Sequence, residues 1–437
     1  HVAQIFEDIG LKQCPNEPCL HRYIDETGEC FVLTYVDDAL ITGTKATVEK
    51  IQAKLKLHFK CKFNEPKDFL GLDVTIAATG NVSLSMSSFT TKMTEQLQIP
   101  RWKGEIGTPG RTDMKIVKDA KDKTKDESYR SKVGSLNWLT VGLRYDLVYA
   151  TKELSRVLTE PTTTALQLLD RALQYTLQTK DAYLEYDYGK MSKFKPPETR
   201  KKPTDNTDIY DTSEYNIQDE IPNNDDVELH QEYLYKGEQI TLTCETDIDL
   251  GGQKETRQST SGYMLYLNGA LVHWRGRTEK IIISSTAAGE YIALSRGNTA
   301  CKFLADILRF YGNSINTYHI YTDNQAAEHI ATQPTMNEHS RSIDIRHHAI
   351  RQDYLNHKLR IGGVKSELNT SDILTKYLQA HLHYVHTSYL HLILPTKMKL
   401  KGRNPYITDS STMDTSTCLL YTFNAAYDSL CTHIHIP

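Results

Sequence analysis

The chain has 437 residues, a length that suggests about two or three domains. Its net charge of −4 and hydrophobic fraction of 39% are ordinary for a globular protein, so the overall charge does not indicate a nucleic-acid partner and any basic surface must be local. The eight cysteines are scattered without a Cys-x-x-Cys pair, which indicates reduced intracellular thiols rather than a disulfide framework. No apolar run approaches a membrane span and no signal peptide opens the chain, which begins at His1 and is expected to be a fragment.

The most informative local motif is Tyr35-Val36-Asp37-Asp38, which lies between an apolar run at 31–34 and a second one that ends at Gly43. The pattern predicts a strand, a tight turn and a strand, with two adjacent carboxylates at the turn. Adjacent carboxylates that face an open site repel each other unless a cation lies between them. Asp37 and Asp38 are therefore candidate metal ligands of the kind that nucleotidyl-transfer enzymes use.

The first 187 residues show two kinds of pattern. Residues 1–92 are expected to alternate helices and strands, with a helix near 48–55 and a strand over 68–76. Residues 93–187 are expected to be mostly helical, with helical periodicity at 129–139, 150–158 and 165–178.

A charged segment follows at 188–240. It opens with lysines and prolines, and residues 204–240 then hold eleven Asp or Glu against one Lys. Such a segment buries too little apolar surface to offset the entropy lost on ordering, so it is predicted to be a disordered linker.

Residues 241–378 again combine strand and helix patterns. Helical patterns begin near Gly289 and Asp323, a further helix carries His347 and His348, and strand patterns cover 239–246, 262–267, 271–274, 280–284 and 317–322. With a late helix near Asp372, this order predicts a mixed α/β layer fold. The tail, 379–437, has weak periodicity and is expected to be poorly ordered.

Four acids fall where the strands and helices of this region meet: Asp247, Glu290, Asp323 and Asp372. Each one alone is explained as an acid at a helix N-terminus, where the helix dipole favours it. The four together, at the sheet ends that face one crevice, would bind two Mg²⁺ or Mn²⁺ ions, which prefer oxygen ligands. One ion would activate a water and the other would stabilise the leaving oxygen.

Residues 241–378 resemble the RNase H domain of copia-type LTR retrotransposons. The matching segments are Ser259-Thr260-Ser261-Gly262-Tyr263, Ser284-Ser285-Thr286, Glu290-Tyr291-Ile292-Ala293-Leu294, Tyr321-Thr322-Asp323-Asn324-Gln325-Ala326-Ala327, Ile343-Asp344-Ile345-Arg346-His347-His348 and Ser371-Asp372-Ile373-Leu374-Thr375-Lys376. The resemblance implies an RNase H-like mixed sheet flanked by helices and carries the family's metal ligands onto the same four acids. Asp249 is the alternative to Asp247, and His348 matches a family histidine and is an accessory candidate. Leu250 stands where the family has Trp.

The first half resembles the same element. Residues 1–92 resemble the end of its reverse transcriptase palm, and residues 93–187 resemble its thumb/connection region, with Tyr145 where the family has Pro. The chain is thus expected to be an α/β (α+β) fragment of a Pol polyprotein, with a partial palm, a helical thumb/connection, an acidic linker and an RNase H-like domain. No residue before the motif at 35–38 supplies the third palm carboxylate, so the chain alone is expected not to polymerise DNA.

The resemblance also implies the partners. These are an RNA–DNA hybrid and, in the full polyprotein, a template-primer, in an intracellular setting that is a cytoplasmic virus-like particle, the nucleus or both. Candidate contacts to nucleic acid are Arg257, Arg275, Arg277, Lys280, Asn324 and Gln325, together with Lys254. For each basic residue singly, solvated surface charge explains the sequence equally well.

Two alternatives to an enzyme stay open. Leu250, Tyr145 and the unmatched tail favour a decayed remnant without activity. A nucleic-acid-binding module without turnover would keep the same fold.

Overall fold

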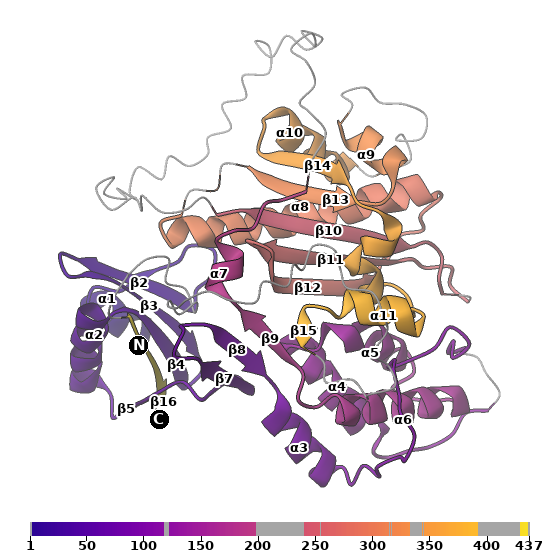
Figure 1. The fold of residues 1–437 in the computed structure, drawn as a ribbon, viewed down its shortest axis with the longest axis horizontal. Coiled ribbons are helices and arrows are strands. Elements are labelled where there is room, and N and C mark those ends of the chain that lie inside the picture. Colours follow the sequence, from indigo (N-terminus) through magenta and orange to yellow (C-terminus); the bar gives the residue numbers. More distant parts are fainter. Residues whose placement is uncertain are drawn as a thin grey trace.

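The computed structural model describes residues 2–117, 122–197, 240–253, 255–313, 315, 317–332, 343, 345–391 and, for the backbone, 429–435. Three sheets with helices packed against them form a mixed α/β architecture (Figure 1), which confirms the predicted fold class. Within these residues, no helix is long and apolar enough to cross a membrane.

The N-terminal sheet has the strand order β1-β2-β3-β4-β16-β5. Two helices accompany it, α1 (Val2–Asp8) and α2 (Lys45–His58), and its strands are β1 (Lys12–Gln13), β2 (Leu20–Asp25), β3 (Gly28–Tyr35), β4 (Asp38–Thr44), β5 (Lys62–Asn64) and β16 (Ser429–His435). Helix α2 contains the predicted helix at 48–55 and buries Val48, Ile51 and Leu55. Strand β16 lies between β4 and β5, so segments from both ends of the chain belong to this sheet (Figure 1).

The second sheet has the order β15-β9-β8-β7-β6. Its strands are β6 (Asp68–Phe69), β7 (Leu72–Ile76), β8 (Val82–Ser85), β9 (Tyr183–Tyr186) and β15 (Leu390–His391). The single strand expected over 68–76 is wrong, because Leu70 and Gly71 form a turn that pairs Phe69 with Leu72. Both turn residues have positive φ (55° and 77°), a conformation that glycine adopts without steric cost.

A layer of helices packs against the second sheet. It consists of α3 (Ser87–Gln96), α4 (Tyr129–Gly142), the short η1 (Tyr145–Leu147), α5 (Val148–Ser155) and α6 (Thr163–Gln178). Helices α4, α5 and α6 correspond to the three predicted helical segments. Tyr145, where the resemblance predicts Pro, is fully buried and donates a hydrogen bond to the carbonyl of His386 (3.0 Å).

The third sheet has the order β12-β11-β10-β13-β14. Its strands are β10 (Leu242–Asp249), β11 (Thr260–Leu267), β12 (Ala270–Thr278), β13 (Tyr318–Thr322) and β14 (Leu359–Gly363), and its helices are α8 (Thr286–Phe310), α9 (Gln325–Thr332) and α10 (Ala349–Leu355). Strands β10, β11 and β12 are antiparallel, whereas β13 and β14 run parallel to β10. The predicted mixed sheet flanked by helices is confirmed.

Two local expectations in this region are wrong. Residues 280–284 form no strand, because the segment crosses from the end of β12 to α8, and Ile282 is 85% exposed. Helix α8 starts at Thr286, where the hydroxyl of Ser285 caps it by accepting a hydrogen bond from the amide of Ala288 (3.2 Å). The late helix expected near Asp372 is a pair of short 3-10 helices, η5 (Ser366–Leu368) and η6 (Thr370–Leu374).

Part of the expected linker and part of the expected tail form regular structure. Residues 188–191 form α7 (Tyr188–Met191), capped by the carboxylate of Asp187, and the carbonyl of Pro197 accepts a hydrogen bond from Tyr321 Oη (2.8 Å). In the tail, α11 (Ala380–His386) buries His383 and His386, so this segment packs against the protein rather than extending into solvent. Residues 198–239, 392–428 and 436–437 lie outside the described residues.

The helical layer and the third sheet share one hydrophobic core. Residues of the helical layer such as Leu136 and Leu173 belong to the same buried cluster as Met264, Tyr266 and Leu374. Trp274 of β12 donates its ring N–H to the carbonyl of Thr140 in α4 (2.8 Å). The helical layer therefore forms one side of the structure that positions the carboxylates described next.

Candidate metal centre

Strand β10 presents three carboxylates, Glu245, Asp247 and Asp249, on one face of the third sheet, because alternate residues of a strand point to the same side. Asp323 directly follows β13, which runs parallel to β10 as its neighbour. Asp372 lies in η6, which packs on this face. Glu290 lies in the second turn of α8.

Three of the four predicted ligands converge. One carboxylate oxygen each from Asp247, Asp323 and Asp372 lies within 4.8 Å of the other two, and within the described parts of the chain this is the group with the spacing of a metal site. Asp247 and Asp372 are buried, with 2% and 7% exposure. Oxygen ligands at this spacing fit a hard divalent cation such as Mg²⁺ or Mn²⁺.

Glu290 is buried next to this group. The hydroxyl of Thr322 donates to Glu290 Oε2 at 3.5 Å. Burial, followed by the negative charges of Asp247 and Asp323, raises the pKa of Glu290 to about 9. Glu290 therefore interacts electrostatically with the three aspartates, although it is not a member of the close group.

The pKa of Asp372 is raised by the same burial and carboxylate charges. Burial and the charge of Asp247 raise its pKa to about 8, while Lys376 acts in the opposite direction. Lys376 Nζ lies 3.0 Å from Asp372 Oδ1 and 3.7 Å from Asp247 Oδ2. Burial alone would lower the pKa of Lys376, but the two aspartates raise it well above its usual value. The ammonium group thus provides positive charge between two carboxylates that would otherwise repel each other.

Asp249 occupies a different environment from Asp247. It lies outside the close group, and burial raises its pKa while Lys115 and Lys376 lower it. Asp247, in contrast, accepts a hydrogen bond from the hydroxyl of Thr375. Of the two candidates on β10, the structure brings Asp247 next to Asp323 and Asp372.

Asp37 and Asp38 are located in the N-terminal sheet. Tyr35 pairs with Asp38, and Val36 and Asp37 form the turn between β3 and β4, with Val36 at φ 54° and 88% exposed. In the part of the chain that the structure describes, no third carboxylate, His or Cys joins them in a group with metal-ligand spacing.

The candidate nucleic-acid contacts differ in exposure and partners. Arg257, Arg275, Lys280 and Gln325 are exposed. Arg277 is half-buried, with its Nε 3.7 Å from Glu279 Oε1. Asn324 caps α9, since its side-chain oxygen accepts from the amide of Ala327 (2.9 Å). Lys254 lies outside the described residues.

His348 contacts the helix that carries Glu290. Its Nδ1 lies 2.9 Å from Tyr291 Oη, and Nδ1 of the neighbouring His347 lies 3.1 Å from Ser295 Oγ. These contacts place both histidines beside α8.

The sequence interpretation assigned no role to Lys376, Thr375, Glu245 or Thr370, although all four contact the aspartates or each other. For Lys376 a signal was present, because a position four residues after Asp372 is the spacing of an ion pair on a helix. The contact between Glu245 and Thr370 joins residues 125 positions apart, and no local pattern could have shown it.

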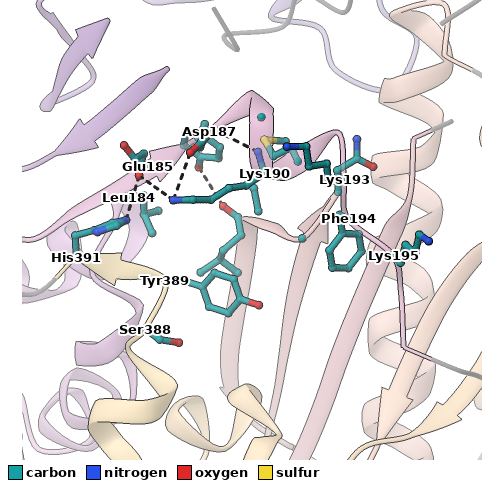
Figure 2. Close-up of a pocket in the computed structure, with 17 residues that line it drawn as sticks. Leu184, Glu185, Asp187, Lys190, Lys193, Phe194, Lys195, Ser388, Tyr389 and His391 are labelled. Atoms are coloured by element: carbon teal, nitrogen blue, oxygen red, sulfur yellow. Dashed lines mark hydrogen bonds and ion pairs between the residues drawn. The ribbon is translucent and has the colours of Figure 1, made fainter. Parts of the chain in front are cut away.

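A separate cavity of about 300 Å³ lies at the other end of β11 and β12 (Figure 2). Its lining includes Lys190, Lys193, Phe194, Tyr389 and His391, and none of the four predicted metal ligands. Lys190 pairs there with Asp187 (3.3 Å) and Glu185 (3.8 Å), so part of the positive charge of this cavity is neutralised. The cavity is not part of the metal centre.

Searches of known proteins found relatives among transposon proteins, and no protein-family model matches the chain. The Pol polyprotein of transposon TNT 1-94 from Nicotiana tabacum is 23% identical over 372 residues, covering 83% of this chain and 24% of the relative. That of transposon RE1 from Arabidopsis thaliana is 26% identical over 352 residues, covering 80% and 20%. A transposon Ty5-1 protein from Saccharomyces cerevisiae is 24% identical over 300 residues, covering 68% and 81%. The chain thus spans about a quarter or less of the two polyproteins.

Among solved structures, the N-terminal RNase H domain of rv2228c from Mycobacterium tuberculosis matches 31% of this chain and 91% of its own, at 12% identity and a TM-score of 0.23. RNase H1 from Halobacterium salinarum matches 31% and 94%, at 17% identity and the same TM-score. These scores are below the level at which an overall likeness of fold is inferred. The two Pol polyproteins, in contrast, match about four fifths of the chain, and they confirm that it resembles the Pol polyproteins of retrotransposons, as its motifs predicted.

Proposed function

We propose that residues 241–378 hydrolyse the RNA strand of an RNA–DNA hybrid with two divalent metal ions, Mg²⁺ or Mn²⁺. The observation that carries this proposal is the convergence of Asp247, Asp323 and Asp372 within 4.8 Å, with Glu290 buried beside them. The sequence relatives are Pol polyproteins, which supports an enzyme of the nuclease or polymerase kind.

The residues of the chain would have distinct roles. Asp247, Asp323 and Asp372 would hold the ions, and Glu290 would complete the ligand set from α8. When bound, the ions supply an activated water and stabilise the leaving oxygen. Thr375 fixes the orientation of Asp247 by donating a hydrogen bond to its Oδ2.

Substrate recognition would depend on the shape, phosphates and 2′-hydroxyls of the hybrid rather than on its sequence. Arg257, Arg275 and Lys280 are exposed and suited to phosphate contacts, and Arg277 and Gln325 are further candidates. Asn324 already caps α9, so we expect it to contribute less. A template-primer partner and a location in virus-like particles or the nucleus stay predictions from the resemblance.

Cleavage of a labelled RNA–DNA hybrid by the full chain in Mg²⁺ or Mn²⁺ tests the proposal. We expect the RNA strand to be cut by the wild type, and Asp323→Asn to abolish cleavage without loss of the fold, because it removes a charged ligand from the group. The matched control is Asp306→Asn, which changes a partly exposed carboxylate of α8 that lies sixteen residues beyond Glu290, about 24 Å along the helix axis. Full activity of Asp323→Asn would refute the assignment.

The same assay separates the alternatives. A chain that binds the hybrid without cutting it would be a nucleic-acid-binding module, and a folded chain that does neither would be a decayed remnant.

For the palm-like region we propose that this chain alone does not extend a primer. Asp37 and Asp38 have no third carboxylate near them within the described residues. Template-dependent DNA synthesis by the 437-residue chain in a primer-extension assay would contradict this proposal.

A further inference from the structure

The segment that carries Asp372 has little regular structure of its own to hold it in place. Asp372 lies in η6, a single short 3-10 helix of five residues, and such helices have weaker hydrogen-bond geometry than α-helices. The position of this ligand therefore depends on contacts of residues 369–375 with the rest of the protein: burial of Ile373 and Leu374 in the core shared with the helical layer, and polar contacts with the sheet.

Three consecutive residues of β10 make polar contacts with this segment. The side-chain amide of Asn369 donates to the carbonyl of Thr246 (2.9 Å), and the hydroxyl of Thr375 donates to Asp247. The third contact is made by Glu245, which is two residues before Asp247 and on the same face of the strand.

Glu245 accepts two hydrogen bonds from Thr370. Its Oε2 accepts a hydrogen bond from the backbone amide of Thr370 (2.8 Å) and another from the hydroxyl of the same residue. Because that hydroxyl donates to Glu245, its oxygen is left to accept from Tyr266 Oη, with which it is also in contact. Charged acceptors form stronger hydrogen bonds than neutral ones, so this carboxylate provides a firm anchor for η6.

We propose that Glu245 is a positioning residue of the metal centre, which holds Asp372 in place through Thr370. This inference rests on the proposed function, since it concerns the same site. In this role Glu245 acts through Thr370 and not as a metal ligand; it fixes the first residue of η6, two positions before Asp372. Its loss would let Asp372 move away from Asp247 and Asp323 and weaken metal binding while the core beneath stays packed.

The test measures metal binding separately from cleavage. We would titrate the full-length chain and its variants with Mn²⁺ and follow the free ion by electron paramagnetic resonance. Glu245→Leu is expected to raise the Mn²⁺ dissociation constant about tenfold or more, which corresponds to about 1.4 kcal/mol. Glu245→Gln keeps an oxygen acceptor for Thr370 and is expected to stay within about threefold of the wild type. Hybrid cleavage by Glu245→Leu should recover at saturating Mn²⁺.

Asp353→Leu is the matched control for a general loss of stability. Asp353 is buried and, like Glu245, accepts hydrogen bonds, from Asn298 (2.7 Å) and Lys302, but it lies in α10. The Asp353→Leu variant should unfold at a lower urea concentration than the wild type, with an unchanged Mn²⁺ dissociation constant. Should Glu245→Leu fail to fold, Thr370→Val is the second test. It removes the hydroxyl but keeps the backbone amide, and we expect its Mn²⁺ dissociation constant to rise about threefold.

The outcomes are distinct. A wild-type Mn²⁺ constant in folded Glu245→Leu, or in Thr370→Val where the first variant does not fold, would overturn the inference, and so would an equal rise in Asp353→Leu. A wild-type chain that binds Mn²⁺ but cuts no hybrid would refute the proposed function and leave the positioning role measurable. A wild-type chain without any Mn²⁺ binding would refute both.

Discussion

Opposite charges lie close together in the candidate metal centre, and Lys376 is the clearest example. Its ammonium lies 3.0 Å from Asp372 and 3.7 Å from Asp247, where it offsets the repulsion between two buried carboxylates. A divalent cation bound by the same oxygens would compete with it.

Lys376→Met should therefore bind Mn²⁺ more tightly, by about tenfold, which is about 1.4 kcal/mol. In EDTA the variant should be less stable than the wild type, because the carboxylates lose their counter-charge. Titration with Mn²⁺ and urea unfolding would measure both effects, with the exposed Lys365→Met as the control. Equal Mn²⁺ affinity in the variant and the wild type would contradict this role.

The raised pKa values of Glu290 and Asp372 predict a pH dependence for the metal-free chain. Both folded-state values, about 9 and about 8, lie above the ordinary values of 4.5 and 3.8. The folded state thus retains protons that the unfolded state releases, and stability falls as the pH rises from about 4 through about 9. Urea midpoints in EDTA should be lower at pH 9 than at pH 6, and Glu290→Gln should flatten the slope. A wild-type midpoint that rises with pH across this range would be inconsistent with these shifts.

At the scale of elements, the sequence was most informative where periodicity was long. Helices α4 and α6 formed where the apolar spacing predicted them. The isoleucine run at 281–283 was misread because an apolar run does not distinguish a strand from a crossing segment that partly buries two of its side chains. Likewise, the turn at Leu70 and Gly71 depends on backbone angles rather than on hydrophobic pattern.

Packing between elements predicts the effect of one glycine substitution. A Cβ at Gly276 of β12 would lie 2.8 Å from the carbonyl of Leu374 in η6 and 2.9 Å from Val148 in α5. Gly276→Ala should destabilise the chain by about 1–3 kcal/mol, because overpacking forces the backbone to move. Gly134→Ala in α4, where a Cβ meets nothing within 4 Å, should be neutral or stabilising by about 1 kcal/mol. Urea unfolding measures both, and equal stability of the two variants would contradict the tight contact.

For the whole molecule, the sequence indicated the resemblance to retrotransposon Pol polyproteins and the four acids, but not how the regions of the chain pack together. The convergence of Asp247, Asp323 and Asp372 was predictable, because Asp247 lies near the end of one strand, Asp323 follows the adjacent parallel strand and Asp372 lies in a short helix. The shared core was not, because it joins residues such as Leu136 and Leu374 that are far apart in the chain. No local pattern indicated that α11 or residues 188–197 would pack on the sheets.

The shared core predicts that residues 240–378 alone are less stable than the full chain. The isolated segment would expose Met264, Tyr266, Ile373 and Leu374, which the helical layer covers. We expect this fragment to bind a hydrophobic dye and to unfold at lower urea than the full chain. Cooperative unfolding of the fragment at the urea concentration of the full chain would show that the helical layer is dispensable.

The same core has an evolutionary consequence. Recombination between related coding sequences could join two parents anywhere along the chain, and the charged stretch at 198–239 would look from the sequence like a neutral junction. In the structure, the segments on either side of that stretch contribute to one buried cluster. A chimera joined there would take one part of this buried cluster from each parent. It would fold stably only where the side chains of the two parents pack together in the cluster.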